Sequence, residues 1–216
     1  MCGRYDMENS RIKFILASAS PRRKELIGHL GIPFEIKTKN IPEESSSQNP
    51  VQFCADIAAE KGRAVLADIT GSGHESFIVS ADTIVCLNNK IYGKPADVDE
   101  ARKFLSELSG KTHSVYTAVS VIHWSPKKQS TFSLVEESLV TFNTITPVLM
   151  DNYLSTGDSL DKAGAYGIQG PSLTFISRVD GCYSNVVGFP LSTFVLESEK
   201  YFHSLFKDKT SWLSLF

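Results

Sequence analysis

An aspartate lies at the middle of the apolar stretch from Phe77 to Leu87. The β-branched and aliphatic residues around it are typical of a strand covered on both faces, where an unpaired charge is costly. Asp82 is therefore expected to meet a cation, bind a metal ion or hold a proton. A turn at Asn88-Asn89 should return the chain along the same sheet, and the second strand ends at Gly93-Lys94-Pro95. The sequence thus predicts Lys94 close to Asp82, a pairing suited to phosphate transfer.

A second candidate site is an unusually basic helix start. Residues 14–18 are a predicted buried strand that ends at Ser18, and Ser20-Pro21 has the composition of an N-cap followed by the first helical position. The helix dipole favours acidic residues in the first turn, but this turn holds Arg22, Arg23 and Lys24. Free backbone N–H groups and two guanidinium groups there would form an anion receptor. A solvated basic turn is the alternative, and the position directly after a buried strand favours the receptor.

Two further segments contain residues that could complete such a site. A second helix is predicted to start at Asn49-Pro50, and Lys61 falls on its apolar face. Its ammonium group either snorkels to water or binds an anion, and the pattern leaves both open. Before this helix, Glu43 and Glu44 lie in a loop rich in proline and serine, where by themselves they would be ordinary surface acids.

The remaining elements are predicted to form scaffold around these residues. The patterns indicate helices from Asp97 to Gly110, from Thr146-Pro147 to Gly157 and from about Pro190, with strands at Thr112 to Trp124, Thr131 to Phe142 and Leu173 to Arg178. The two long strands suggest a meander that could serve as a partner surface. Between them and the last strand, residues 161–170 contain three glycines, Tyr166 and Gln169, a weak signal for close backbone approach to a ligand.

Composition limits the function classes. With 216 residues, 42% of them hydrophobic, and a formal charge of -2, the chain is an ordinary α/β domain and not a protein that neutralises a nucleic-acid polymer. No apolar run has the length of a signal peptide core or a membrane span, and the four cysteines are scattered, so we expect reduced thiols and a cytoplasmic location. We expect a flexible leader at residues 1–12, one domain at 13–207 and a tail at 208–216. Neither the P-loop motif nor the Gly-x-Gly-x-x-Gly motif is present.

Six segments, taken in order, resemble the Maf family of nucleoside triphosphate pyrophosphatases. They are Leu16-Ala17-Ser18-Ala19-Ser20-Pro21-Arg22-Arg23, Ala59-Glu60-Lys61, Ser80-Ala81-Asp82-Thr83, Gly93-Lys94-Pro95, Leu108-Ser109-Gly110-Lys111-Thr112-His113 and Asp161-Lys162-Ala163-Gly164-Ala165-Tyr166-Gly167-Ile168-Gln169-Gly170. The resemblance extends from about residue 14 to about residue 191. It implies a mixed, twisted β-sheet with flanking helices, as in the inosine triphosphate pyrophosphatases, and two lobes around a cleft. It also implies a homodimer and a divalent cation, Mg²⁺ or Mn²⁺, for the release of pyrophosphate.

The resemblance also implies roles for individual residues. Asp82 corresponds to the proton acceptor, and Asp82 and Glu44 to the metal-binding acids, although Pro42 leaves Glu43 as an alternative to Glu44. The triphosphate cradle would consist of Ser18, Arg22, Arg23, Lys61 and Lys94. Thr83 and Gln169, with Arg22, fall where the family discriminates among bases. The glycine-rich segment is most similar to the subgroup that acts on dTTP and UTP. The alternatives are the 7-methyl-GTP specificity of a sister subgroup and a non-catalytic nucleotide-binding regulator of cell division.

Overall fold

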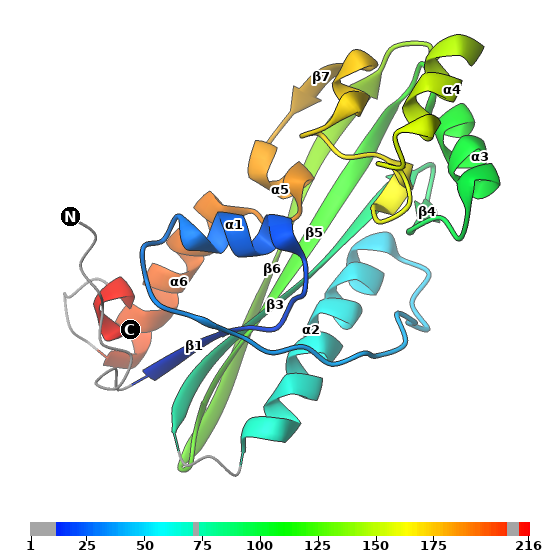
Figure 1. The fold of residues 1–216 in the computed structure, drawn as a ribbon. Helices are drawn as coiled ribbons and strands as arrows, with labels where there is room; N and C mark the ends of the chain where they lie inside the picture. Colours follow the sequence, from blue (N-terminus) through cyan, green and yellow to red (C-terminus); the bar gives the residue numbers. More distant parts are fainter. Residues whose placement is uncertain (1–11, 71–73, 207–211) are drawn as a thin grey trace.

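A computed structural model describes residues 12–70, 74–206 and 212–216 of the chain. Its sheet has the strand order β2-β1-β3-β5-β6-β7, and β4 pairs with β3 outside this path (Figure 1). The strands are β1 (Ile12–Leu16), β2 (Glu35–Ile36), β3 (Glu75–Leu87), β4 (Lys90–Tyr92), β5 (Thr112–Ser125), β6 (Lys128–Phe142) and β7 (Ile176–Asp180). β1 runs parallel to β2 and β3, whereas the other pairs are antiparallel. The predicted mixed sheet is confirmed.

One edge of β3 is shared between two short strands that do not meet. β1 pairs with residues 75–79 of β3, and β4 pairs with residues 85–87. Within the described residues, no strand pairs with residues 80–84 on this side, whereas β5 pairs with them on the other. Successive side chains of a strand point to opposite faces of the sheet. Where an edge has no neighbouring strand, side chains from both faces can be reached from that edge. Asp82 and Thr83 lie in this opening.

The helices are α1 (Pro21–Gly28), α2 (Pro50–Ile69), α3 (Val98–Leu108), α4 (Pro147–Ser155), α5 (Tyr183–Val187) and α6 (Leu191–Phe206), and the 3₁₀ helices are η1 (Ala163–Ala165), η2 (Pro171–Thr174) and η3 (Trp212–Leu215). Four of them begin at the predicted caps. The side chains of Ser20, Asn49, Asp97 and Thr146 each accept a hydrogen bond from a backbone N–H of the first turn. Asn88 and Asn89 adopt positive φ angles of 52° and 64°, which confirms the tight hairpin between β3 and β4.

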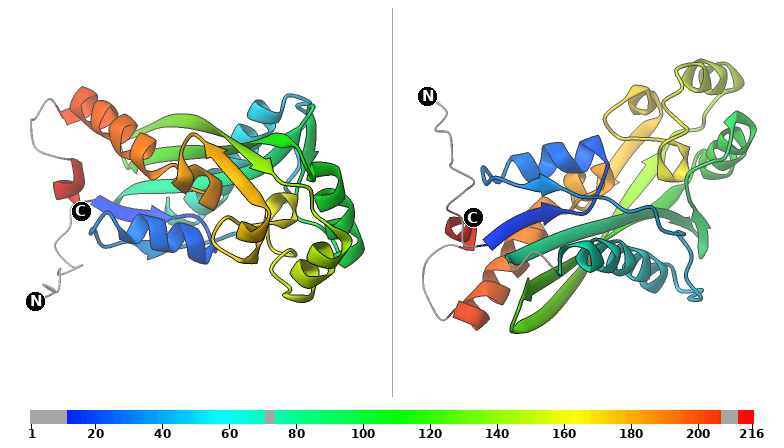
Figure 2. Two further views of the ribbon diagram at one scale, coloured as in Figure 1. Left: turned by 90° about the horizontal axis from the view of Figure 1, so that it is seen from above. Right: turned by 60° about the horizontal axis from the view of Figure 1, so that its bottom comes forward.

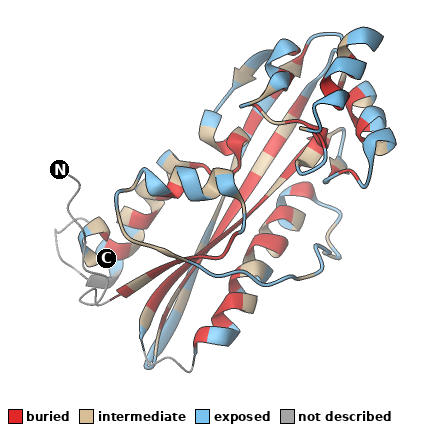
Figure 3. Ribbon diagram, viewed as in Figure 1, coloured by how far each residue is buried: buried red, intermediate tan, exposed pale blue. Residues whose placement is uncertain are grey.

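The sheet extends through two lobes with separate cores. In one lobe, α2 covers one face of the sheet, and α1 and α6 cover the other (Figures 1 and 2). In the other lobe, α3, α4 and η1 pack on the far ends of β3, β5 and β6 around Leu105, Phe142 and Tyr153. Buried residues follow the length of β3 and β5 (Figure 3). The predicted arrangement of two lobes around a cleft is confirmed.

The C-terminal part differs most from the sequence-based prediction. Residues 171–174 form η2 instead of the start of a strand, so β7 begins at Ile176. α5 was not predicted, because it is only five residues long and has no side-chain cap. Residues 208–216 were expected to be a tail, but Trp212 is buried and stacks on Phe202 with ring centroids 5.6 Å apart. In the described part of the chain, none of the helices is long and apolar enough to cross a membrane.

Candidate active site

A cavity of about 800 Å³ opens at the uncovered edge of β3, between the two lobes. Its lining includes residues from the start of α1, the middle of β3, the end of β4, α2, the loop around η1 and the turn after α5. Eight of the residues nominated from the sequence line it, namely Ser18, Arg22, Arg23, Lys61, Asp82, Thr83, Lys94 and Gln169. Glu44 does not line the cavity, whereas its neighbour Glu43 does.

The ammonium group of Lys61 lies between two carboxylates. Its Nζ is 2.7 Å from Oδ1 of Asp82 and 2.6 Å from Oε1 of Glu43. Asp82 is 7% exposed, and Lys61 extends toward it from the buried face of α2. The ammonium group of Lys61 therefore does not simply snorkel to water, because it forms ion pairs with two acids. Lys61 also supplies the cation that a buried Asp82 requires.

Glu43 occupies the position expected for Glu44. Burial raises the pKa of Glu43, but the hydrogen bond and charge of Lys61, together with the charges of Lys94 and Arg23, outweigh this effect and hold the pKa below its usual value. The positive charge in the cavity therefore favours Glu43 in its ionised form. Sequence alone could not choose between the adjacent acids, because both lie in a segment without helix or strand.

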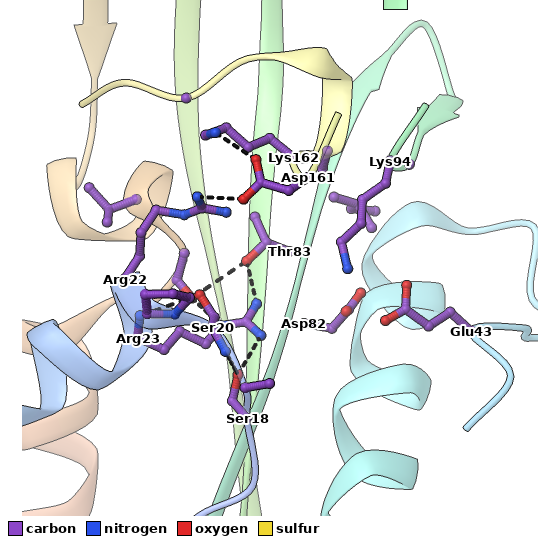
Figure 4. Close-up of a pocket in the computed structure, with 18 of the residues that line it drawn as sticks. Ser18, Ser20, Arg22, Arg23, Glu43, Asp82, Thr83, Lys94, Asp161 and Lys162 are labelled. Atoms are coloured by element: carbon purple, nitrogen blue, oxygen red, sulfur yellow. Dashed lines mark hydrogen bonds and ion pairs between the residues drawn. The ribbon is translucent and has the colours of Figure 1, made fainter. Parts of the chain in front are cut away.

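Arg23 links three segments of the cavity lining through hydrogen bonds to neutral oxygens. Its Nε donates to the Gly188 carbonyl at 2.8 Å, Nη1 to Oγ of Ser18 at 3.3 Å, and Nη2 to Oγ1 of Thr83 at 3.0 Å (Figure 4). Burial lowers the pKa of Arg23, and the charge of Asp82 opposes that shift. Among the described residues, three of its five N–H groups are thus bound to the protein, which leaves two for a ligand. Arg23 fixes the positions of Ser18 and Thr83 in addition to its expected role toward phosphate.

Arg22 links two segments of the cavity lining. Its Nη1 is 3.2 Å from Oδ2 of Asp161, so the ion pair joins the first turn of α1 to the loop before η1 (Figure 4). Asp161 is also 2.6 Å from Lys162, whose Nζ donates to the carbonyl and the carboxylate of Asp158. Lys162 is therefore engaged within its own loop, whereas Arg22 is held by a single exposed carboxylate that a phosphate could replace.

The glycine-rich loop is held against β3 and β5. Gly164 has a φ of 67°, and a Cβ at this position would lie 2.8 Å from Cγ2 of Val85. Tyr166 forms a buried hydrogen bond of 2.7 Å with Nε2 of His113 on β5. These contacts place Gln169 on the cavity wall. Asp161 and His113 lie in segments that carry the family resemblance, but sequence reasoning gave them no role, because a surface-type acid and a lone histidine carry no spacing signal.

Comparison with known proteins identifies the family. Residues 13–199 match the model of the Maf-like proteins. The chain belongs to the Maf family. Similar relatives are a dTTP/UTP pyrophosphatase of Deinococcus radiodurans, 44% identical over 83% of this chain and 88% of the relative, and one of Bacillus cytotoxicus, 40% identical over 88% of this chain and 95% of the relative. The solved Ham1 protein of Staphylococcus aureus is 12% identical, with a TM-score of 0.40 over 87% of this chain and 99% of that one.

The cavity of this Maf-family chain has two chemically different sides. Asp82, Glu43 and Lys94 lie on the side next to α2, and Arg22, Arg23 and Ser18 lie on the side next to α1 (Figure 4). Thr83 stands between them on β3. An anion bound across the cavity could therefore meet cations from both sides while a carboxylate pair faces one of its ends.

Proposed function

We propose that the protein is a nucleoside triphosphate pyrophosphatase that hydrolyses dTTP and UTP to the monophosphate and pyrophosphate. The observation that carries the proposal is the presence, in one cavity, of an acid pair bridged by Lys61 and of further cations that include Lys94 and Arg22. Hydrolysis of a phosphoanhydride needs a base for water and positive charge for the departing pyrophosphate. The dTTP/UTP pyrophosphatase names of relatives that are 38–44% identical support the substrate class.

Asp82 is the proposed general base. Lys61 bonds one of its oxygens, and no hydrogen bond to the other oxygen occurs within the described residues. That second oxygen would accept the proton of a water whose oxygen attacks the α-phosphorus, while the bond from this phosphorus to the bridging oxygen breaks. Pyrophosphate leaves with the bonding electron pair, and Lys61, Lys94 and Arg22 would neutralise its charge.

The donor set fits a divalent cation such as Mg²⁺ or Mn²⁺. Oxygens of Glu43 and Asp82 already converge on one cation, the ammonium of Lys61, at 2.6 and 2.7 Å. Magnesium sites in nucleotide enzymes typically use one or two carboxylates and complete the shell with phosphate and water, which suits a chain whose described residues contain no cluster of three or more such ligands. Asp82 and Glu43 would hold the cation, which when bound supplies Lewis-acid polarisation of a phosphate oxygen.

Gln169 and Thr83 are the proposed base-reading residues. A side-chain amide donates and accepts at once, which matches the imide edge of thymine and uracil. CTP lacks the N3–H donor and replaces one carbonyl with an amine, so polar groups would remain unpaired. ATP and GTP are larger than the pyrimidine for which this edge is suited.

We also propose a homodimer, as the family resemblance implies, and a cytoplasmic location, which the scattered cysteines favour. Size-exclusion chromatography with light scattering would give twice the mass of 23.8 kDa. A monomer at micromolar concentration would contradict the dimer without affecting the proposed reaction.

Steady-state rates of pyrophosphate release from dTTP, UTP, CTP, ATP and GTP test the proposed function. We expect dTTP and UTP to be the best substrates, and Gln169→Ala to reduce their advantage over CTP. If wild-type protein released no pyrophosphate from any of the five, the enzymatic proposal would be wrong. A preference for 7-methyl-GTP in the same assay would instead support the specificity of the sister subgroup.

A further inference from the structure

A series of hydrogen bonds leads from Thr83 into the protein interior, away from the cavity. Thr83 on β3 faces its cross-strand partner Thr117 on β5, and their hydroxyl oxygens are 3.0 Å apart. The hydroxyl of Thr117 in turn donates to the backbone carbonyl of Asn185 at 3.0 Å. Thr117 and Asn185 are fully buried, and neither lines the cavity.

The Asn185 carbonyl, at the end of this series, fixes the direction of both hydrogen bonds between the three residues. The two oxygen–oxygen contacts need one proton each, and the two hydroxyl groups supply two protons. The Asn185 carbonyl has none to give, so Thr117 must donate to it. The proton between the threonines therefore comes from Thr83.

Thr83 is thus left without a proton for the cavity. Nη2 of Arg23 donates to its oxygen at 3.0 Å, which occupies one lone pair. The carbonyl of Gly188, 3.5 Å away, is at the limit of a hydrogen bond and competes poorly with Thr117 at 3.0 Å. What remains is one lone pair on a residue that lines the cavity. Thr83 can accept a hydrogen bond from a ligand and cannot donate one.

The carbonyl of Asn185 cannot readily turn away. The side-chain amide of Asn185 donates to the Val115 carbonyl at 3.1 Å and to Oγ of Ser138 at 2.9 Å, which ties α5 to β5 and β6. The N–H of Gly188 also donates to the Asn185 carbonyl, at 2.9 Å. The acceptor at the end of the series is therefore fixed by the sheet.

We propose that Thr117 and Asn185 are positioning residues that keep Thr83 an acceptor, so that Thr83 takes the N3–H of a uracil or thymine base. An acceptor-only oxygen disfavours phosphate oxygens, which also only accept, and disfavours the N3 of cytosine for the same reason. This inference rests on the proposed function for the identity of the base. It adds that Thr117 and Asn185, which do not line the cavity, contribute to the selection against cytosine beside Gln169.

The substitution Thr117→Val tests the direction of the hydrogen bond between Thr83 and Thr117. Valine keeps the shape of threonine and removes the acceptor for the Thr83 proton, so that Thr83 becomes free to donate into the cavity. We expect the affinity for CTP to rise and the UTP-to-CTP affinity ratio to fall about tenfold. The reason is that N3 of cytosine would gain a hydrogen-bond donor, and a hydrogen bond to a group that was buried and unpaired typically changes affinity by that factor. Thr117→Ser keeps the hydroxyl and should keep the wild-type ratio.

Binding should be measured by calorimetry with the α,β-methylene analogues of UTP and CTP, which share one sugar and one phosphate tail. Ser80→Ala is the matched control, because Ser80 is a buried hydroxyl of β3, the strand of Thr83, and it donates to the Ala58 carbonyl at 2.6 Å on the opposite face of the sheet. We expect this control to leave the ratio unchanged. Equal weakening of both analogues by Thr117→Val, with the ratio unchanged, would overturn the inference and make Thr117 a structural hydroxyl.

A second variant covers the case in which Thr117→Val fails to fold. Thr83→Val removes the acceptor itself, so the UTP analogue should lose about tenfold in affinity, and the CTP analogue should lose little. Equal losses for the two analogues would overturn the inference. Absence of UTP hydrolysis by wild-type protein would contradict the proposed function, whereas the affinities for the two analogues still decide whether Thr83 accepts a hydrogen bond from the base.

Discussion

At the scale of single residues, the most informative contact is the ammonium of Lys61 between Glu43 and Asp82. A cation between two acids holds them close together, as a shared base and metal site requires, and it keeps Glu43 ionised by lowering its pKa. The buried run around Asp82 and the basic start of α1 made Asp82, Arg22 and Lys94 predictable from sequence. The choice of Glu43 over Glu44 was not predictable, because the loop before α2 has neither periodicity nor caps.

The adjacent acids give a matched pair of substitutions. Glu43→Gln removes a cavity carboxylate that faces Lys61, and we expect it to weaken Mn²⁺ binding and pyrophosphate release by about 10–100-fold. Glu44→Gln changes the same group one residue away, outside the cavity, and should stay within about twofold. Manganese titration followed by electron paramagnetic resonance, together with activity, measures both effects. The reverse order would restore Glu44 as the functional acid.

Asp82→Asn tests the general base. It preserves the shape of the side chain and removes the basic oxygen, so we expect the rate of pyrophosphate release to fall about 10²–10⁴-fold. Affinity for the α,β-methylene analogue of UTP should change far less than the rate. Activity within threefold of wild type would show that Asp82 is only the structural partner of Lys61.

At the scale of elements, helix starts and turns were the most predictable features. Caps such as Ser20 and Asn49 and the hairpin at Asn88-Asn89 depend on local chemistry that a sequence displays directly. η2 and α5 were missed because tertiary contacts stabilise them instead of an amphipathic pattern. The glycine-rich loop was recognised by composition, but its packing partners come from strands that are distant in sequence.

Gly164 is expected to be indispensable for this loop. Gly164→Ala combines a positive φ, which costs about 1–2 kcal/mol for alanine, with a Cβ placed 2.8 Å from Val85, which adds an overpacking cost of about 1–3 kcal/mol. Gly157→Ala is the control, because its φ is 72° and a Cβ there meets nothing within 4 Å. Denaturant unfolding of the two variants should separate the two costs. Equal destabilisation would show that the loop can move away from Val85.

The buried His113 on β5 should make stability fall in acid. Burial lowers the pKa of His113 from 6.5 to about 4, so between these values the unfolded chain binds a proton that the folded chain does not. This contribution is complete above pH 6.5 and is lost as the pH falls toward about 4, at a slope of up to ~1.4 kcal/mol per pH unit. His113→Gln keeps a partner for Tyr166 and should flatten the slope, as measured by urea unfolding at a series of pH values. Identical slopes would contradict a buried neutral His113.

At the scale of the whole molecule, the site exists because β1 and β4 leave the middle of one edge of β3 uncovered. This opening lets Asp82 and Thr83, which point to opposite faces of the sheet, line the same cavity. Sequence patterns predicted the strands and the α/β class, and the family resemblance supplied the mixed sheet and the two lobes. The position of the opening could not be predicted, because it depends on which residues of three strands pair. The expectation that β5 and β6 form a partner surface stays a prediction.

We propose that this cavity releases pyrophosphate from a pyrimidine triphosphate in one step. Phosphorus-31 nuclear magnetic resonance of UTP during turnover, with Mg²⁺ present, distinguishes the possible products. We expect UMP and pyrophosphate to appear in equal amounts from the first turnovers, without UDP or free phosphate, and Asp82→Asn to suppress both products. Accumulation of UDP and inorganic phosphate would mean cleavage at the terminal phosphate and would contradict a pyrophosphatase.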